Sequence, residues 1–509
     1  MVRLVPSANQ SQLSPPEWLR YLLPSVTDLL FIILLASMTI GSFAPRMLGD
    51  AGIGWHIRNG ELMLRTHTIT HTDFFSSTMA GRPWYAWEWL YDVKIAIVHH
   101  WWGLNGVVFV TALGIALTFA LLFYWIRSRG TDLFVAVVMV VLAISASSIH
   151  MFARPHIVSW FLTLIWFQLL DQAEINRNRR YLYWLPVITI AWVNLHGSFL
   201  VGLILLAIYL VAALIRGREN LEWSKSLGSV FLMTLLATLV NPYGYKLHVH
   251  IYEYLSNRFL MDHIDEFASP NFHGAAQRCF LALLLIAVTA LAARREKIRA
   301  STLLVMLFAA YSGLYASRNL PVSSILLAIT AGPILSAAIG SVNEKFARLL
   351  SFSERMGKME AGSCGHLWPA LAVLFGLVVC SGQGSLGGQQ LMSAHFDEKR
   401  FPVQAASALE HMGLPRQVFA PDYWGGYLIY RFYPRMRVVL DDRHDLYGEA
   451  FLREYIATIR VTPGWEKMLD EKHVEWALLP EKSSLANMLK VAGWKVYYED
   501  ETGVVLQKP

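Results

Sequence analysis

Apolar residues form long runs along most of the chain, and short polar segments separate these runs. A helix needs about 20 residues to cross the roughly 30 Å hydrocarbon core of a membrane. The pattern predicts eleven membrane-spanning helices, at approximately residues 23–44, 104–126, 131–149, 156–172, 182–195, 198–215, 226–242, 278–293, 301–316, 320–340 and 367–384. The run at 182–195 is short for a complete span.

The last part of the chain has a different pattern, in which helix-like and strand-like stretches alternate. The helix-like stretches are VQAASALEHM, EAFLREYIATI and WEKMLDE, and the strand-like ones are QVFA, MRVVLDD, VEWALLP, WKVYYED and GVVLQK. A hairpin turn is expected at residues 501–503, and the PDYWGG stretch also predicts a turn. We therefore predict a mainly α, polytopic transmembrane bundle of about eleven spans, followed by a small soluble α/β domain at 386–509.

Basic residues are concentrated in every second loop, which predicts the orientation of the chain. The basic loops contain Arg127, Arg129, Arg177, Arg179, Arg180, Arg216, Arg218, Lys225, Arg294, Arg295, Lys297, Arg299, Lys345, Arg348, Arg355 and Lys358. Basic residues in short loops mark the cytoplasmic side of a membrane. We expect a cytoplasmic segment at 1–22, a transmembrane domain at 23–385 with long outer loops at 45–103 and 243–277, and an extracytoplasmic C-terminal domain.

Composition supports this assignment. Of 509 residues, 55% are hydrophobic and 16% are charged, whereas a soluble protein carries about a quarter charged residues. The net charge of +6 is explained by the basic loops, so we expect membrane lipids and no nucleic acid as partners. Cys279, Cys364 and Cys380 have no spacing typical of a disulfide framework or a thiolate metal site.

The N-terminal segment is polar, and the apolar run that follows it lacks a small-residue cleavage signature, which predicts a retained signal anchor. Short cytoplasmic loops favour the inner membrane of a bacterium. The 45–103 loop is rich in tryptophan, which is typical of helices that lie in the membrane interface. These indoles belong to Trp55, Trp84, Trp87, Trp89, Trp101 and Trp102.

Polar and ionisable residues at the span ends are concentrated on the outer side. They are Asp50, His56, His150, Arg154, His156, Asn194, His196, Asn241, Arg318 and Asn319. An ionisable group near hydrocarbon usually faces a wet cavity lined by protein. The set predicts a shared outer cavity, although for each residue taken alone helix capping or interfacial anchoring is favoured.

Asp50 lies directly after the first predicted span, in the sequence RMLGDAGIGWH. Its carboxylate suits a general base that takes a proton from an acceptor hydroxyl, and it suits equally an N-cap for a helix that begins near Ile53. Asp73 and Glu88 are the other acidic candidates in this loop. A carboxylate and a histidine can together bind a divalent metal, so a metal is possible here, but no spacing is diagnostic.

Arg154 and His156, in the sequence FARPHIV, suit an anion such as a phosphate, because guanidinium offers a planar fork of donors. Arg318 in ASRNLP is a second candidate for this role. Interfacial anchoring explains the three residues equally well.

Substrate binding is assigned to His56, Glu88, Asn194 and His196. The amide and imidazole in WVNLHG suit sugar hydroxyls, or they satisfy backbone groups at a tight helical hairpin. The NPYG stretch at 241–244 reads as a helix terminator. For residues 441–443 (Asp-Asp-Arg), a solvated turn is favoured over a role in lining a site.

These residues in this order resemble the GT-C superfamily of membrane glycosyltransferases, and most of all the bacterial Rgt-type and aminoarabinose-transferase-like enzymes. The resemblance rests on the acid after the first span and on RPH, WVNLHG, NPYG and SRN at successive outer span ends. It implies a polyprenyl-phosphate-linked sugar donor, a lipid or glycan acceptor, inversion at the anomeric carbon, and Asp50 as the catalytic base.

The chain departs from that pattern in one respect, because Asp50 has no acidic neighbour where many relatives have a pair. Either Asp73 supplies the second catalytic acid through the fold, or the protein is not catalytic. DYWGGY is only faintly similar to the WWDYG signature of oligosaccharyltransferases, and its function is not carried over. Two alternatives stay open: a surface-polysaccharide polymerase or ligase that uses Arg and His, and a non-catalytic transporter or scaffold, against which the lack of repeated halves argues.

Overall fold

The computed structural model describes residues 20–217, 220–294, 297–339, 344–363 and 365–509. Most of the predicted segment 1–22, together with Arg218, Arg295 and Cys364, therefore lies outside the described residues. The chain divides into two compact units. Unit 1 contains Met1–Ser37, Ala112–His150 and Ser269–Val378, and unit 2 contains Met38–Thr111, Met151–Ala268 and Val379–Pro509. The domain boundaries expected at residues 22 and 385 stay predictions.

An α-helix coincides with each of the eleven predicted spans, so the mainly α, polytopic architecture is confirmed. These helices are α2 (Val26–Thr39), α4 (Trp89–Ser128), α5 (Leu133–Ser147), α6 (His156–Asn176), α7 (Trp184–Val193), α8 (Phe199–Ile215), α9 (Leu221–Ala237), α12 (Ala275–Ala293), α13 (Ala300–Tyr315), α14 (Leu320–Ile339) and α16 (Leu367–Ser381). Within the described ranges, four helical segments are long and apolar enough to cross a membrane: Trp89–Ser128, Leu133–His150, Ala275–Ala293 and Ser317–Ile339. With ten residues, α7 extends only about 15 Å.

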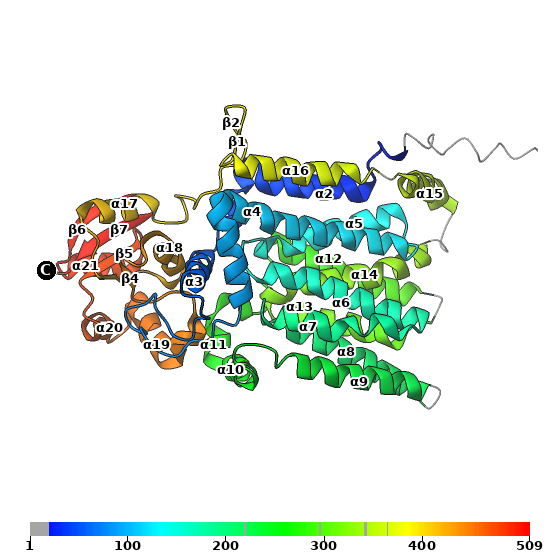
Figure 1. The fold of residues 1–509 in the computed structure, drawn as a ribbon, viewed down its shortest axis with the longest axis horizontal. Helices are drawn as coiled ribbons and strands as arrows, with labels where there is room; N and C mark the ends of the chain where they lie inside the picture. The colour runs from blue at the N-terminus through cyan, green and yellow to red at the C-terminus, as the bar shows by residue number, and fades with distance from the viewer. Residues whose placement is uncertain (1–19, 218–219, 295–296, 340–343, 364) are drawn as a thin grey trace, which may run out of the picture. The chain divides into compact units, whose positions relative to one another are not determined.

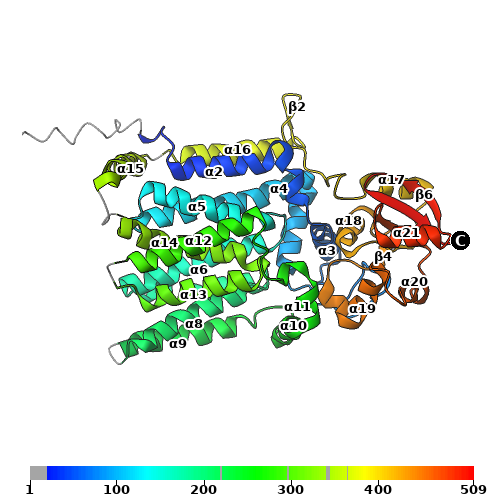
Figure 2. The ribbon, with the colours of Figure 1, turned by 180° about the vertical axis from the view of Figure 1, so that it is seen from behind.

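Unit 1 is a bundle of apolar helices. The helices α5, α12 and α14 pack against one another, and α13 also packs against α14 (Figure 1). Figure 2 shows α2 and α16 side by side, and the indole Nε1 of Trp368 donates a hydrogen bond to the carbonyl of Leu22 at 2.8 Å beside them. The helix α15 (Glu344–Gly362) also belongs to this unit. A short 3₁₀ helix, η8 (Ser317–Asn319), precedes α14 and carries Arg318.

The first segment of unit 2, Met38–Thr111, includes the 45–103 loop, and the helices expected in this loop are present. Their position in the membrane interface stays a prediction. After η2 (Gly41–Phe43) and η3 (Pro45–Leu48), the helix α3 covers Gly52–Thr66. The first part of α4 follows, and a kink at Gly103, where φ is 58°, separates it from the long apolar part. The amino-terminal part of α4 is therefore a separate helical stretch before the predicted span.

The remaining helices of unit 2 pack against the next helix in the sequence or the one after it. The pairs α6 and α8, α7 and α9, and α8 and α9 are in contact. Two short helices, α10 (Tyr245–Ser256) and α11 (Arg258–His263), follow α9. The predicted terminator at 241–244 is confirmed, because α9 ends at Ala237 and the side chain of Asn241 accepts a hydrogen bond from the amide of Tyr243 at 2.8 Å.

Residues from 385 onward contain the strands, and most of the predicted elements are present. The helices are α17 (Val403–Met412), α18 (Asp422–Phe432), α19 (His444–Ile459), α20 (Glu466–Glu471) and α21 (Ser484–Val491), and the strands are β1 (Ser385–Leu386), β2 (Gln389–Gln390), β3 (Gln417–Val418), β4 (Arg437–Val438), β5 (Trp476–Pro480), β6 (Lys495–Glu499) and β7 (Gly503–Gln507). The strands β5, β7 and β6 form an antiparallel sheet in that order, and β3 pairs with β4 in parallel.

The turn predicted for PDYWGG is wrong, because α18 begins at Asp422 and contains both glycines. The two glycines allow α18 to approach α3 closely. A Cβ atom on Gly426 would lie 2.3 Å from the carbonyl oxygen of Ala51, and one on Gly54 would lie 2.1 Å from the carbonyl oxygen of Gly426. Glycine at these positions reflects close backbone contact, which a sequence pattern cannot distinguish from a turn.

Candidate active site

Arg154 lies between two carboxylates of unit 2, just before α6. Its Nη1 atom is 2.9 Å from Oδ2 of Asp442 and 3.2 Å from Oδ1 of Asp50. The side chains of Arg154, Asp50 and Asp442 are 23%, 34% and 17% exposed. We call these three residues the open triad. It joins segments 104 and 288 residues apart in the chain.

The start of α3 holds the open triad in place. Oδ1 of Asp50 accepts a hydrogen bond from the amide of Gly52 at 2.9 Å. The N-cap of α3 is Ala51, so the N-cap role expected for Asp50 is wrong by one residue. The indole Nε1 of Trp55 donates to Oδ1 of Asp442 at 2.9 Å. A Cβ atom on Gly52 would lie 1.4 Å from Nη1 of Arg154, so only glycine leaves room for the guanidinium.

A second arginine, Arg443, also lies between two carboxylates, but these three groups are buried. Its Nη2 atom is 2.8 Å from Oδ1 of Asp73 and 2.6 Å from Oδ2 of Asp441, and none of the three side chains is more than 2% exposed. The guanidinium carbon lies 4.5 Å from the ring centroid of Trp84. We call Arg443, Asp73 and Asp441 the buried triad.

The position of Asp73 bears on its predicted role as a second catalytic acid. Its carboxylate accepts hydrogen bonds from the amides of Phe75 and Ser76 and from the hydroxyl of Ser76, in addition to the contact with Arg443. This set of partners is typical of a structural carboxylate.

The solvated turn favoured for residues 441–443 is wrong, because Asp441 and Arg443 are buried. The whole segment 441–445 links distant parts of unit 2. Besides the two triads, His444 pairs with Asp422 at 2.8 Å and Asp445 pairs with His250 at 3.2 Å. The segment follows the buried Leu440, and its partners lie far away in the sequence, so the charges alone could not reveal them.

A row of imidazoles and carboxylates also lies in unit 2. Nδ1 of His56 is 2.6 Å from Oδ1 of Asp92, and Nε2 of His56 is 3.8 Å from Oε2 of Glu88. On the other side, Oε1 of Glu88 is 3.5 Å from Nε2 of His196. Three of the four residues expected to bind substrate are therefore together.

The fourth, Asn194, has a structural environment. Its side-chain oxygen accepts a hydrogen bond from Nε1 of Trp89 at 2.7 Å, and its amide nitrogen donates to the carbonyls of Ile190 and Val240. These contacts match the alternative in which Asn194 satisfies backbone groups at a helical hairpin.

Two of the three expected phosphate ligands, Arg154 and His156, belong to unit 2, and the third belongs to unit 1. Arg154 belongs to the open triad, and His156 is the first residue of α6, where its ring centroid lies 5.5 Å from that of Trp160. Arg318 belongs to unit 1, in η8.

Charge and burial set the protonation of these groups. Burial lowers the pKa of His56, and the positive charge of Arg154 lowers it further, so this imidazole is neutral at pH 7. Burial raises the pKa of Asp442 to about 6, against the opposing effect of Arg154. Burial also raises the pKa of Asp73, but the charge of Arg443 and the hydrogen bonds to Ser76 outweigh it, and the net shift is downward.

A metal site requires several ligand side chains that are arranged around one ion. Across the described residues, no group of three or more His, Cys, Asp or Glu side chains is arranged to hold a metal ion. The divalent metal considered from the sequence stays a prediction.

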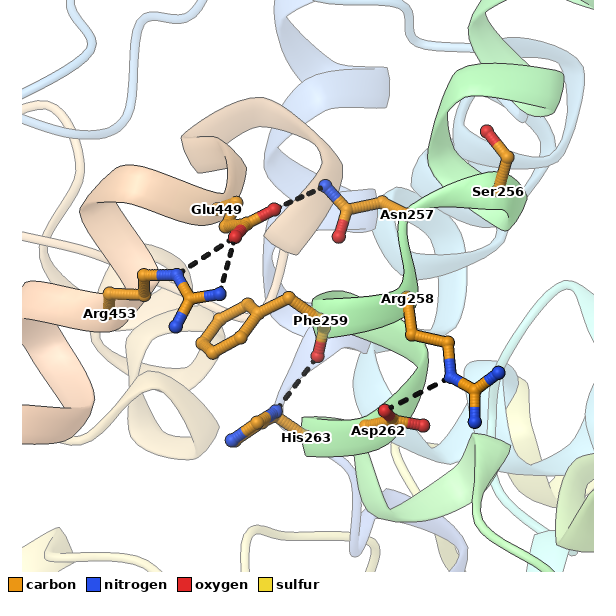
Figure 3. Close-up of a pocket in the computed structure, with 8 residues that line it drawn as sticks. All are labelled: Ser256, Asn257, Arg258, Phe259, Asp262, His263, Glu449 and Arg453. Atoms are coloured by element: carbon orange, nitrogen blue, oxygen red, sulfur yellow. Dashed lines mark hydrogen bonds and ion pairs between the residues drawn. The ribbon is translucent and has the colours of Figure 1, made fainter.

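A surface groove of about 560 Å³ lies elsewhere on unit 2, between α11 and α19 (Figure 3). Figure 3 shows Arg453 beside the ring of Phe259, with 3.9 Å between the guanidinium carbon and the ring centroid. Glu449 accepts hydrogen bonds from Arg453 and from Asn257. Because the charges in this groove already neutralise each other, it is a weaker candidate for a phosphate than the open triad.

No protein-family model and no sequence of a characterised protein matches the chain. Solved structures with a similar fold include the oligosaccharyltransferase of Archaeoglobus fulgidus without ligand (11% identity, 89% of this chain and 68% of that chain, TM-score 0.53). The oligosaccharyltransferase AglB of that organism in complex with an inhibitory peptide and a dolichol-phosphate matches with 12% identity, the same coverage and a TM-score of 0.51.

ArnT from Cupriavidus metallidurans in the apo state matches at 13% identity and a TM-score of 0.51, over 94% of this chain and 95% of that chain. These proteins are GT-C glycosyltransferases, and the similarity extends over most of the chain. The chain therefore has the fold of the GT-C membrane glycosyltransferases.

Proposed function

We propose that the chain is a glycosyltransferase that moves a sugar from a polyprenyl-phosphate-linked donor to a lipid or glycan acceptor at the outer face of a bacterial inner membrane. The open triad is the observation that carries this proposal, because it combines a partly exposed arginine with a partly exposed carboxylate. The shared fold supports it, since one AglB structure is a complex with a dolichol-phosphate. Fold alone does not determine a reaction, so the argument rests on the residues.

Arg154 is suited to bind the donor phosphate. Its hydrogen bonds to Asp50 and Asp442 both use Nη1, so these two carboxylates leave Nε and Nη2 available. A guanidinium with donors to spare can bind a phosphate oxygen without first leaving its carboxylates. The negative charge that develops on the leaving phosphate is the charge that such a group stabilises.

Asp50 is suited to be the general base. Its Oδ1 atom contacts Gly52 and Arg154, whereas Oδ2 accepts no hydrogen bond from the described residues. In the proposed step, the acceptor oxygen forms a bond to the anomeric carbon while its proton moves to Asp50. The bond between that carbon and the phosphate oxygen breaks, and the electron pair leaves with the phosphate beside Arg154. A single displacement of this kind inverts the anomeric carbon.

We assign Asp73 a structural role, in place of the second catalytic acid considered from the sequence. The arrangement of its partners supports this assignment, because a buried carboxylate that is paired with Arg443 has no access to an acceptor.

The test is sugar transfer by purified protein in lipid, with a mixture of polyprenyl-phosphate sugars as donors. Asp50→Asn and Arg154→Ala are each expected to lose at least about 100-fold in rate. Arg453→Ala, which removes the same charge from the surface groove, is expected to keep the wild-type rate. Undiminished transfer by Asp50→Asn with loss in Arg154→Ala would overturn the base assignment in favour of a polymerase or ligase that relies on arginine.

A further inference from the structure

The carboxylate of Glu88 lies between two imidazole nitrogens. Its Oε2 atom is 3.8 Å from Nε2 of His56, and its Oε1 atom is 3.5 Å from Nε2 of His196. The side chains of His56, Glu88 and His196 are 0%, 15% and 8% exposed. The pair of carboxylate oxygens is therefore flanked by one ring nitrogen on each side, in a sheltered but accessible place.

The opposite nitrogen of each imidazole is fixed by another contact. Nδ1 of His56 is bound to Asp92 at 2.6 Å, and Asp92 accepts a second hydrogen bond from Asn59 at 2.7 Å. Nδ1 of His196 lies 2.8 Å from Oγ of Ser159. These partners orient both rings so that Nε2 faces Glu88, which makes the arrangement rigid before any ligand arrives.

Nε2 of His56 lacks a hydrogen-bond partner among the described residues, although it is buried. Its separation of 3.8 Å from Glu88 is too long for a hydrogen bond. A buried polar atom left without a partner costs about 1–3 kcal/mol, so such an atom beside an accessible carboxylate points to a ligand. A hydroxyl oxygen about 2.8 Å from both Nε2 and Oε2 satisfies the two atoms together when Nε2 carries the ring proton, because the hydroxyl then accepts from Nε2 and donates to Oε2. Burial raises the pKa of Asp92, which allows this carboxyl to keep its proton and donate it to Nδ1 of His56.

We propose that Glu88, His56 and His196 bind two adjacent hydroxyl groups of the transferred sugar, which makes this cluster a vicinal-diol site. Each hydroxyl donates to one oxygen of Glu88 and contacts the Nε2 atom of one histidine. This inference rests on the proposed function and adds the class of sugar: one that carries two free neighbouring hydroxyls. Glu88 is a specificity-determining residue in this account.

The carboxylate of Glu88 links the diol site to Arg154. Positive charges of Arg154, Arg443 and neighbouring histidines act on His56. The charge of Glu88 also acts on Arg154, so the diol site and the proposed phosphate site share one electrostatic environment. That proximity fits a sugar attached to a phosphate.

The first experiment measures binding of the methyl glycosides of glucose, galactose, mannose and arabinose to the full-length protein in detergent, by saturation-transfer NMR. At least one glycoside is expected to bind, with affinity reduced about tenfold or more when its neighbouring hydroxyls are methylated. Glu88→Gln is expected to reduce the affinity for the unmodified glycoside similarly. Glu61→Gln is the matched control, since Glu61 contacts Arg58 and His99, and it is expected to leave binding unchanged.

Three outcomes would overturn the diol site: no glycoside binds, binding is indifferent to Glu88→Gln, or the methyl glycoside of an amino sugar binds more tightly than its neutral counterpart. Thermal unfolding of Glu88→Gln establishes that the variant is folded. Binding of bare polyprenyl phosphate, followed by tryptophan fluorescence, separates this inference from the proposed function. Glycoside binding that depends on Glu88, without polyprenyl-phosphate binding, would uphold the diol site and refute the lipid-linked donor.

Discussion

Two arginines of unit 2 each lie between two aspartates, yet the two triads differ in what they leave available. In the buried triad, Arg443 and both carboxylates are almost completely shielded from solvent. In the open triad, Arg154, Asp50 and Asp442 keep between 17% and 34% of their side chains exposed. One arginine and two aspartates therefore serve stability in one place and are available for chemistry in the other, and exposure is what separates the two roles.

The segment 441–445 connects the two triads, because it supplies one residue to the open triad and two to the buried triad. Asp441 and Arg443 are members of the buried triad, and Asp442, which lies between them in the sequence, contacts Arg154 of the open triad. Since the buried triad holds the segment on both sides of Asp442, it positions the open triad. A substitution in one triad is thus a control for the same substitution in the other.

The largest effect on folding is expected from Arg443→Ala. It leaves Asp73 and Asp441 buried without their counter-charge, which costs about 3–5 kcal/mol. Arg154→Ala is expected to cost less, about 1–2 kcal/mol, because Asp50 and Asp442 keep 34% and 17% of their side chains exposed. Thermal unfolding in detergent measures both. Equal destabilisation by the two substitutions would remove the distinction between the triads.

A smaller effect, directed at transfer and not at folding, is expected from Gly52→Ala. The added Cβ would lie 1.4 Å from Nη1 of Arg154, so the guanidinium must move by an ångström or more. A displacement of that size in a reacting group costs about 100-fold in rate. Gly228→Ala is the matched control, since a Cβ there has no neighbour within 4 Å, and a full rate in Gly52→Ala would contradict the assigned role of Arg154.

The two triads are also expected to respond to pH in opposite directions. The pKa of Asp442 is raised to about 6 by burial, so the folded state holds this proton more tightly than the unfolded state does. Stability from this group is present at low pH and is lost as pH rises from about 4 to 6, by roughly 1–3 kcal/mol.

For Asp73 the sign is reversed. Its pKa is lowered, because the Arg443 charge and hydrogen bonds outweigh burial, so its contribution is present above about pH 4 and is lost on acidification. Unfolding of Asp442→Asn and Asp73→Asn from pH 3.5 to 7 checks both signs. The prediction fails for the open triad should Asp442→Asn keep the wild-type decline between pH 4 and 6.

The smallest effect is expected from Arg453→Ala in the surface groove, within about 0.5 kcal/mol of wild type. Its side chain is 58% exposed and its partner Glu449 is 39% exposed, and exposed ion pairs within a helix contribute little. A loss of several kcal/mol by thermal unfolding would show that exposure does not separate structural from surface arginines in this molecule.

The sequence predicted the spans well because crossing a membrane requires only a local run of apolar residues. It predicted Asp50, Arg154, His56 and His196 as candidates because each is a polar group at a span end, and Glu88 because it is an acidic residue in the long first outer loop. It did not reveal which of these residues are in contact, since Arg154 is 104 residues from Asp50 and 288 residues from Asp442 along the chain. The charged segment 441–445 read as a surface turn because its partners lie in other segments.

Glycine was the other source of error. Gly425 and Gly426 read as turn residues, whereas they lie in α18. Close contact between two helices leaves no local pattern beyond small residues, so the packing of α18 against α3 could only be seen in three dimensions.

The central claim is that Asp50, and not its companion Asp442, accepts the proton from the acceptor. The direct test is the rate of sugar transfer by Asp50→Asn and Asp442→Asn under saturating polyprenyl-phosphate-linked donor. Both substitutions remove one carboxylate from the same guanidinium, so any general effect on Arg154 is shared. We expect Asp50→Asn to lose about 100-fold to 10,000-fold and Asp442→Asn to lose about tenfold or less. Equal losses, or an undiminished rate in Asp50→Asn, would contradict the claim.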